Sequence, residues 1–341
     1  MIRISRLFMI LLASIATSLA SVGTAGAAEK TYTLTIGTWG SPLHPHEELF
    51  VKPFMNLVEK NSHGRIKFKY FSRGTMVKED TVPSAILGDN VDIALTIIDS
   101  WAGRLKDVSI AATPLWTLSM QQDTRELVPG HALYDDISNE FTARGVKVLC
   151  LFDIGPTIIA SKKPIREPKD IKGMVIRSLS KGSSETLEAL GASPIVLDVG
   201  DVYQALQSGT IDAAMNGIQG AVGLKYSEIA KYVLVPNGVF GTLISGYVMN
   251  QRKLSSLPPD LQKVVTDAAM TIRNEAQPKI NETYFDYYLK QLEKGGMKAY
   301  ILQRNTPEWN TWSHVLDNFR TRKAASYSPK IIKDIEQAAG K

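Results

Sequence analysis

Short apolar runs alternate with segments whose apolar residues recur at helical spacing, and this alternation continues through most of the chain. Alternating polar and apolar positions predict a strand over residues 32–37, and continuous apolar runs predict buried strands over 91–96 and 146–152. Apolar residues three and four apart predict a helix over residues 47–59. Strands that alternate with helices favour an α/β fold with mostly parallel sheets.

One pattern occurs twice. Residues 82–94 and residues 202–214 each predict a helix, a glycine turn and a buried strand, with Asp92 or Asp212 as the second residue of the strand. The repetition either reflects the common vocabulary of α/β proteins or marks two similar lobes. Two lobes that close around a ligand are the architecture of periplasmic binding proteins.

The last third of the chain predicts a long helix. It begins at Pro258-Pro259, runs towards Leu292 and ends at Gly295-Gly296. Pro278 lies inside this helix and predicts a kink, because proline has no N–H and its ring clashes with the preceding turn.

Residues 1–27 have the three-part layout of a secretory signal peptide. Arg3 and Arg6 precede an apolar run over residues 7–19, and the small residues Ala25-Gly26-Ala27 follow it. The alternative is an uncleaved membrane anchor, but the run is shorter than the ~20 residues that a membrane span needs. We therefore expect cleavage after Ala27 and a mature protein that acts outside the cytoplasm.

Composition narrows the compartment and the partners. The chain has 39 Lys and Arg against 34 Asp and Glu, and the charges are interspersed without a basic tract. This distribution argues against nucleic acid as a partner. Cys150 is the only cysteine, so no intramolecular disulfide can form, and its apolar neighbours predict a buried, inert thiol. A large exported protein without disulfides fits a bacterial periplasm.

Motifs of common enzymes and metal sites are missing from the sequence. It contains no Gly-x-Ser-x-Gly, His-Glu-x-x-His, Cys-x-x-Cys or phosphate-binding loop. His44 and His46, beside Glu47 and Glu48, could form a metal site, but Pro45 between them favours a loop that leads into a helix. We predict no metal, no cofactor and no catalytic residue.

Two polar residues at the ends of predicted strands are candidates for ligand binding. Arg177 follows the apolar strand 174–176, and its planar guanidinium suits a carboxylate. Asn216 ends the strand 211–215, and its amide can both donate and accept hydrogen bonds. From the residues alone, a surface ion pair is the favoured interpretation of Arg177, whereas a turn or cap role for Asn216 is equally open.

Several motifs together resemble the solute-binding protein of a tripartite ATP-independent periplasmic (TRAP) transporter, of the dicarboxylate-binding (DctP) type. The resemblance covers nearly all of the mature chain. It is strongest in the segments Lys162–Ile165, Pro168–Arg177, Leu187–Pro194 and Val202–Ala213, followed by Asn216.

This resemblance implies two α/β lobes with a ligand cleft between them and a long kinked helix that spans both. We expect the signal peptide in 1–27, the first lobe in 28–152 with parts of the C-terminal region returning to it, the second lobe in 153–250, and the long kinked helix and C-terminal helices that pack across both in 251–341. The resemblance also implies that Arg177 binds a ligand carboxylate, that Asn216 contacts the ligand, and that membrane subunits driven by an ion gradient receive it.

The chain departs from the family pattern at two places. Met215 stands where many members have Glu, and the strand 155–160 lacks an Arg that many members carry. We therefore predict an organic acid with one carboxylate and a partly apolar or aromatic body. The aromatic candidates for contact with that body, for which core packing is the alternative, are Trp39, Trp116, Phe240 and Tyr247. A monomer is the simplest state for such a carrier, while a periplasmic enzyme or a sensor that feeds a receptor are the alternative functions.

Overall fold

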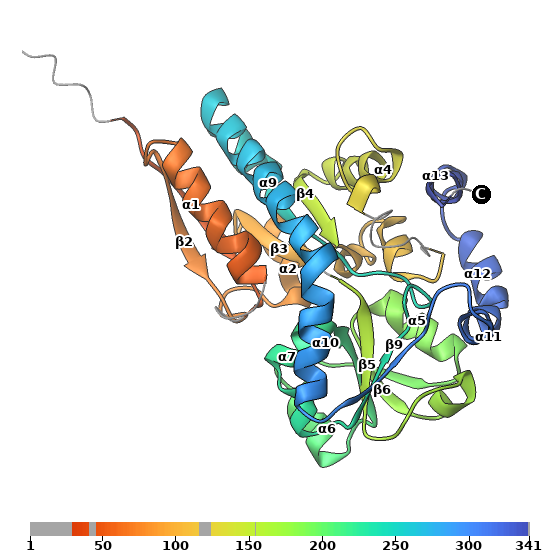
Figure 1. The fold of residues 1–341 in the computed structure, drawn as a ribbon. Coiled ribbons are helices and arrows are strands. Elements are labelled where there is room, and N and C mark those ends of the chain that lie inside the picture. The colour runs from red at the N-terminus through yellow and green to blue at the C-terminus, as the bar shows by residue number, and fades with distance from the viewer. Residues whose placement is uncertain (1–28, 41–45, 116–123, 154, 340–341) are drawn as a thin grey trace, which may run out of the picture.

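The computed structural model describes residues 29–40, 46–115, 124–153 and 155–339. Two α/β lobes lie one above the other in Figure 1, each built around its own sheet. The predicted signal peptide falls outside the described residues. No helix in the described part of the chain is long and apolar enough to cross a membrane.

The sheet of the first lobe has five strands, and four of them run in the same direction. β1 is parallel to β2 and to β3, whereas β10 is antiparallel to both of its neighbours, β3 and β4. In spatial order the strands are β2 (Ile66–Phe71), β1 (Tyr32–Gly37), β3 (Ile93–Ile97), β10 (Ile244–Asn250) and β4 (Val146–Asp153).

The sheet of the second lobe has six strands, and only β5 runs against the others. It is antiparallel to β9 and to β8, while β11 is parallel to β9 and β6 is parallel to β8 and β7. In spatial order the strands are β11 (Lys298–Ile301), β9 (Tyr232–Val235), β5 (Thr157–Ser161), β8 (Ala213–Gly217), β6 (Val175–Ser178) and β7 (Ser193–Val196).

The two antiparallel strands are those through which the chain enters a new lobe. β4 of the first sheet is followed by β5 of the second, and β9 of the second is followed by β10 of the first. A chain that leaves one sheet and enters the other directly must run away from the gap between them. The carboxyl ends of the parallel strands of both sheets therefore face this gap.

The aspartates of the repeated sequence pattern, Asp92 and Asp212, make equivalent hydrogen bonds in the two lobes. Asp92 Oδ2 accepts a hydrogen bond from Thr35 N–H at 2.7 Å, and the Asp92 N–H donates to Thr35 O at 3.1 Å. In the second lobe, Asp212 Oδ2 accepts from Val175 N–H at 2.9 Å, and Asp212 N–H donates to Val175 O at 2.8 Å. Each aspartate thus fixes its strand to the neighbouring parallel strand, so the two lobes are built alike at this position.

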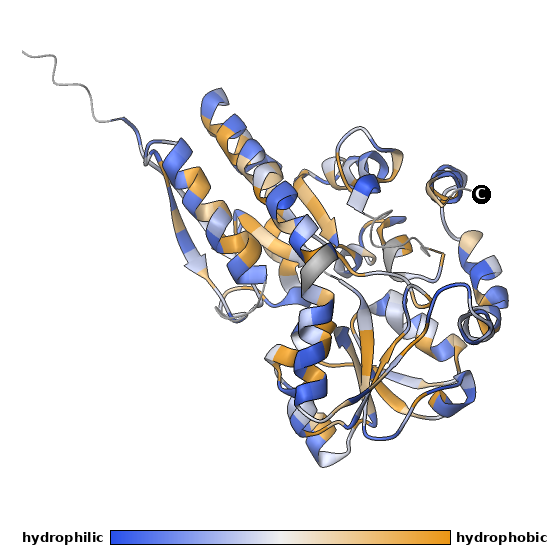
Figure 2. Ribbon diagram, in the orientation of Figure 1, coloured by the Kyte–Doolittle hydropathy of each residue, from blue (hydrophilic) through white to orange (hydrophobic). Residues whose placement is uncertain are grey.

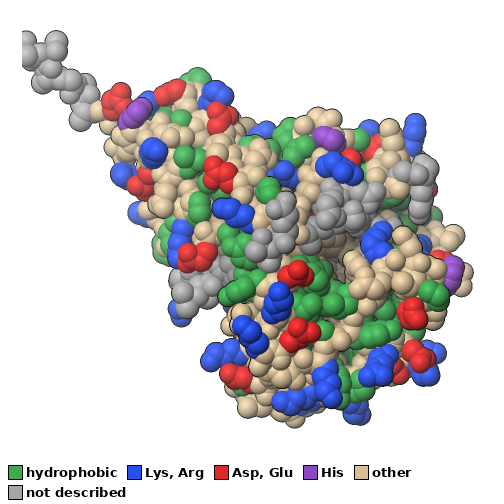
Figure 3. Space-filling model, in the orientation of Figure 1, with side chains coloured by type: hydrophobic (Ala, Val, Ile, Leu, Met, Phe, Trp, Pro, Cys, Tyr) green, Lys and Arg blue, Asp and Glu red, His purple; other side chains and the backbone are tan. Residues whose placement is uncertain are grey.

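Helices cover both faces of each sheet, and Figure 2 shows apolar strands inside each lobe and mixed helix surfaces outside. On the face in Figure 3, basic and acidic side chains are interspersed over both lobes, as the sequence predicts. The helices are α1 (Lys52–Asn61), α2 (Val82–Leu87), α4 (Ala132–Thr142), α5 (Lys181–Ala189), α6 (Val202–Ser208), α7 (Ile218–Gly223), α8 (Gln251–Ser255), α9 (Pro259–Lys279), α10 (Phe285–Lys294), α11 (Pro307–Val315), α12 (Asp317–Ala324) and α13 (Pro329–Ala338).

The predicted long helix spans both lobes (Figure 1). α9 packs on β4 and α1 of the first lobe, and α10 packs on α7 of the second. Between them lies one π-helical turn, Ile280–Tyr284, just after Pro278. The irregularity expected at Pro278 is therefore absorbed by a wider turn, and the helix continues.

The C-terminal helices also contact both lobes. Trp312 of α11 is buried in the core of the second lobe, and its indole N–H donates to Arg166 O at 3.1 Å. Ile331 and Ile335 of α13 pack in the core of the first lobe. The segment 307–338 therefore connects the two lobes on the side opposite α1 (Figure 1).

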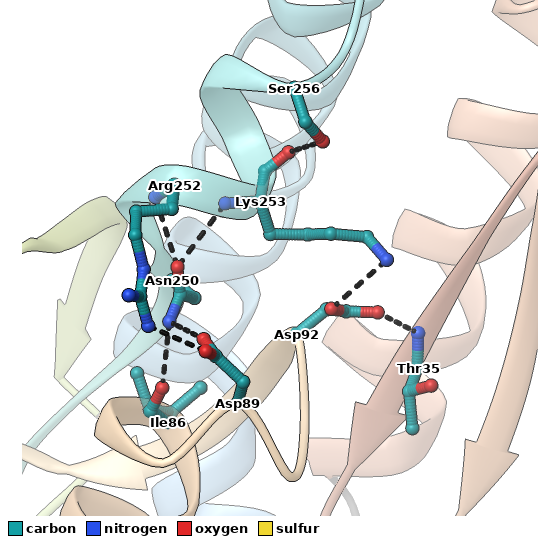
Figure 4. A network of polar contacts seen from close by, with 8 residues as sticks. All are labelled: Thr35, Ile86, Asp89, Asp92, Asn250, Arg252, Lys253 and Ser256. Atoms are coloured by element: carbon teal, nitrogen blue, oxygen red, sulfur yellow. Dashed lines mark hydrogen bonds and ion pairs between the residues drawn. The ribbon is translucent and has the colours of Figure 1, made fainter.

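The chain returns to the first lobe earlier than the expected ranges have it. The range 153–250 ends with β10, which pairs in the first sheet because the chain crosses back after β9. Figure 4 shows how this return is fixed. Asn250 Nδ2 donates to Ile86 O at 2.9 Å, and its Oδ1 caps α8 by accepting from the N–H groups of Arg252 and Lys253.

Candidate ligand-binding site

Arg177 lies in β6, near the carboxyl end that faces the first lobe. Its Nε donates to Leu197 O at 3.3 Å, and its Nη1 donates to Met215 O at 2.9 Å. The two carbonyls belong to the chain just after β7 and to β8, the strands on either side of β6. The guanidinium is thus held by the backbone of both neighbours.

The guanidinium is buried without a carboxylate partner. Arg177 is 6% exposed, and it takes part in no ion pair with a described residue. Burial lowers its pKa, while the nearby Tyr226 and Asp198 act in the opposite direction. An arginine keeps its charge under such conditions, so the site holds a desolvated cation. Nη2 donates to none of the described residues and can serve an added anion.

Asn216 lies beside this cation but uses its amide within the second lobe. Its Nδ2 donates to the Tyr226 hydroxyl at 3.0 Å, and its Oδ1 accepts from Gly217 N–H at 2.9 Å. A side chain at Gly220 would come within 2.8 Å of Asn216 Oδ1, so glycine is required there. One amide hydrogen is left for a further acceptor. Tyr226, which sequence reasoning missed, connects Asn216 with Arg177.

Two of the four candidate aromatics are core residues. Tyr247 is fully buried in the first lobe and stacks on Phe54 with ring centroids 5.1 Å apart. Phe240 is 4% exposed in the core of the second lobe, where it packs edge-on against Trp312 at 5.7 Å. In this arrangement both side chains pack as ordinary core residues, and contact of either with a ligand stays a prediction.

Of the other two candidate aromatics, Trp39 and Trp116, the structure describes only Trp39. Trp39 follows β1 at the edge that faces the second lobe and is partly buried, with His46 edge-on at 5.6 Å. Trp116 lies outside the described residues. Trp39 is thus the candidate whose position suits contact with a ligand in the cleft.

Met215 occupies a different place from the one that the sequence suggested. Its side chain is 1% exposed and packs in the core of the second lobe, while its carbonyl holds Arg177. Having Met at position 215, where many family members have Glu, therefore affects the core of the second lobe. It does not by itself make the cleft less polar.

Residues from opposite lobes meet around this site. Lys78 Nζ lies 3.1 Å from Asp198 Oδ2, and Asp198 is near enough to Arg177 for the guanidinium to help lower its pKa. His46 Nε2 of the first lobe and Gln219 Nε2 of the second lobe lie 3.4 Å apart. Leu179 packs against the apolar clusters of both lobes. The lobes are thus in contact, a closed arrangement that sequence reasoning could not provide because these partners are far apart in the chain.

The described residues include no cluster of three or more His, Cys, Asp or Glu side chains that could hold a metal ion. Cys150 is fully buried in the first lobe, and burial raises the pKa of its thiol to about 12.

Comparison with known proteins gives consistent matches. Residues 36–319 match the family model DctP, described as bacterial extracellular solute-binding protein, family 7. The C4-dicarboxylate-binding periplasmic protein DctP of Vibrio cholerae is 25% identical over 258 residues, 74% of this chain and 75% of that protein. The 2,3-diketo-L-gulonate-binding periplasmic protein YiaO of Escherichia coli is 23% identical over 238 residues, 69% of this chain and 71% of that protein.

Solved structures show the same fold. The extracytoplasmic solute receptor DctP7 of Bordetella pertussis, which binds pyroglutamic acid, superposes with a TM-score of 0.82 at 17% identity, covering 91% of this chain and 100% of that chain. A TRAP periplasmic solute-binding protein of Desulfovibrio salexigens with bound orotic acid gives a TM-score of 0.80 at 23% identity, covering 91% and 98%.

Proposed function

The chain belongs to the DctP family of bacterial extracellular solute-binding proteins, family 7, and we propose that it captures one organic monocarboxylate through Arg177. Members of this family are the solute receptors of TRAP transporters and are not enzymes. On this proposal the protein acts in the periplasm as a monomer. It closes around the acid and delivers it to membrane subunits.

The observation that carries the proposal is the buried, unpaired guanidinium of Arg177. A desolvated cation without a counter-ion is costly, and a carboxylate that binds it recovers that cost. Leu197 O and Met215 O hold Nε and Nη1, so the direction of Nη2 is fixed before a ligand arrives. The anion therefore meets a preorganised donor.

The proposal of a ligand with one carboxylate is supported by the number of buried arginines near the site. Among the described residues, the only buried arginines are Arg177 and Arg273, and Arg273 lies in α9, where its Nε donates to Leu151 O in the first lobe. Among the described residues, therefore, no second buried guanidinium lies beside Arg177 to bind another carboxylate.

The apolar part of the proposed ligand is supported from both lobes. Leu179 follows Arg177 by two residues and packs on apolar clusters of both lobes. Trp39 lies at the facing edge of the first sheet. These contacts favour a compact acid with an apolar or planar body. The pyroglutamic acid and orotic acid of the two similar structures each have one carboxyl group on a compact ring.

A thermal-shift screen followed by calorimetry tests the proposal. The screen includes L-pyroglutamate, orotate, benzoate and 2-oxoisovalerate as monocarboxylates, and succinate, malate and galacturonate as competitors. We expect a monocarboxylate to bind tightest. A dicarboxylate that binds more tightly than every monocarboxylate would refute the ligand class while leaving acid binding intact.

The anchor is tested separately with Arg177→Met. This change should weaken binding of the best acid by about 2–5 kcal/mol, because it leaves the carboxylate buried without its partner. Arg144→Met, at an exposed position after α4, is the matched control and should bind like the wild type. Equal affinity of the two variants would remove Arg177 from the site.

A further inference from the structure

A carboxyl group of the first lobe is enclosed by the second lobe. Asp99 lies in the short 3-10 turn Ile98–Trp101 that follows β3, at the sheet edge facing the other lobe. This turn packs against α5 of the second lobe. Asp99 is only 4% exposed, and its buried carboxyl oxygens lie near the Ser180 side chain and the Gly182 N–H without a hydrogen bond of regular geometry to a described residue.

The surroundings of Asp99 do not compensate its charge. Burial raises its pKa to about 6, and the Ser180 side chain and the Gly182 N–H, at the first turn of α5, lower it by less. Glu185 of α5 raises the pKa further, and Lys323 of α12 lowers it. Lys323 is already engaged, because its Nζ lies 2.5 Å from Glu185 Oε2.

The remaining elements packed on this turn bring no further charge. The helix α2, residues 82–87, and the 3-10 turn Val108–Ala112 contain no ionisable side chain. The ionisable residue of β10 is Tyr247, which packs on the opposite face of the sheet from Ile98 and Trp101. Tyr327, which follows α12, is the other ionisable group near Asp99. The N-terminal turn of α5 is therefore the main polar surface that closure presents to this carboxyl group.

We infer that Asp99 makes closure of the lobes depend on pH, so that the closed form gains over the open form as the pH falls. The inference rests on the proposed function, because it requires that the lobes separate and close. When α5 withdraws from Asp99, water reaches the carboxyl group, and the open form binds a proton only as weakly as an ordinary aspartate. Closure then takes up a proton.

The size of the effect follows from linkage. With a pKa of about 6 in the closed form and 3.8 in the open form, the ratio of closed to open molecules should be about tenfold larger at pH 5 than at pH 7. The sign is that of a raised pKa: the gain is fully present at low pH and is lost as the pH rises through 6. Ligand affinity should follow the same course.

Glu79 provides a contrast within the same lobe. It is also buried, with a pKa raised to about 7 by desolvation, but its Oε1 accepts from Ile97 N–H at 2.7 Å and from the Thr96 hydroxyl at 3.0 Å. These partners belong to the first lobe, so closure does not change them. Glu79 should therefore titrate without affecting the ratio of closed to open molecules.

Single-molecule fluorescence energy transfer measures that ratio without a ligand. Lys60→Cys in α1 and Gln204→Cys in α6 place two dyes on exposed positions of opposite lobes, and the buried Cys150 stays unlabelled. The ratio is measured from pH 4.5 to 8 in the labelled wild type, in Asp99→Asn, which mimics the protonated group, and in Glu79→Gln. Asp99→Ser is the second variant at position 99, and far-UV circular dichroism checks folding at each pH.

We expect a rise of about tenfold from pH 7 to pH 5 in the wild type and in Glu79→Gln, and a flat response in both Asp99 variants. A flat response in the wild type, or the same rise in the Asp99 variants, would overturn the inference. Because the measurement contains no acid, a failure of Arg177 to bind one leaves this result unaffected, and a failed pH response leaves the acid-binding test intact.

Discussion

Gln277 joins the segments that connect the two lobes, and its replacement should cost more stability than any exposed glutamine. Its Oε1 accepts from Asp153 N–H at 3.0 Å, and its Nε2 donates to Asp153 O at 2.9 Å and to Asn281 Oδ1 at 3.0 Å. Asp153 ends β4 at the first crossing, and Thr242 of the second crossing donates to Asp153 Oδ2 at 3.3 Å. Gln277 is 2% exposed on α9, one residue before Pro278.

Gln277→Met keeps the volume and shape of the side chain but removes all three hydrogen bonds. Two of them serve the buried backbone of Asp153, and a buried polar group that loses its partner costs about 1–3 kcal/mol. We therefore expect a loss of about 2–4 kcal/mol in the free energy of unfolding. Urea titration followed by far-UV circular dichroism and tryptophan fluorescence measures it.

Gln204→Met in α6 is the matched control, because the same chemical change is made at an exposed position. It should alter the free energy of unfolding by less than about 0.5 kcal/mol. If the two variants lost equal stability, the polar junction at Asp153 would contribute nothing beyond the general effect of the substitution, and the reasoning would fail.

Three further predictions concern buried groups. Tyr247→Phe removes a buried hydroxyl that has no hydrogen-bond partner among the described residues, so calorimetric affinity should not change and the melting temperature should stay equal or rise; a loss of affinity would return Tyr247 to the site. Glu79 has a pKa raised to about 7, so its contribution to stability is complete below pH 4.5 and is lost as the pH rises through 7. At pH 8 the free energy of unfolding of Glu79→Gln, measured by urea titration, should exceed that of the wild type by roughly 2–3 kcal/mol, with little difference at pH 4.5. An equal gain at both pH values would contradict this. Cys150 should react with a thiol reagent at pH 8 only in urea, and rapid labelling of the native protein would show that its burial is wrong.

Local patterns predicted many of the helices and strands, although β9, β10 and β11 were not among them. The helix, turn and Asp of residues 82–94 and 202–214 specify one geometry because the aspartate acts on the adjacent strand in both lobes. The long helix was predictable because its apolar spacing continues past Pro278. Such features depend on residues that are close in the sequence or on one repeated unit.

Features that depend on strand faces and distant partners could not be predicted in the same way. Tyr247 and Phe240 were candidates for contact with a partly apolar ligand because they are aromatic, but the register of β10 and the position of α11 place them in two cores. Lys78 and Asp198 are 120 positions apart and meet only when the lobes do. No short-range pattern contains that information.

The position of the Arg177 guanidinium depends on the backbone of the second sheet rather than on the neighbouring side chains. Two backbone carbonyls, at positions 197 and 215, fix the guanidinium, and neither depends on which side chain those positions carry. Met215 can therefore pack into the core and still present its carbonyl to Nη1. What this position requires is that β6 lies between β7 and β8 with Arg177 near its carboxyl end. If Arg177 anchors the acid as proposed, selection among acids depends on the other groups near the carboxylate, for which Leu179 and Trp39 are the described candidates.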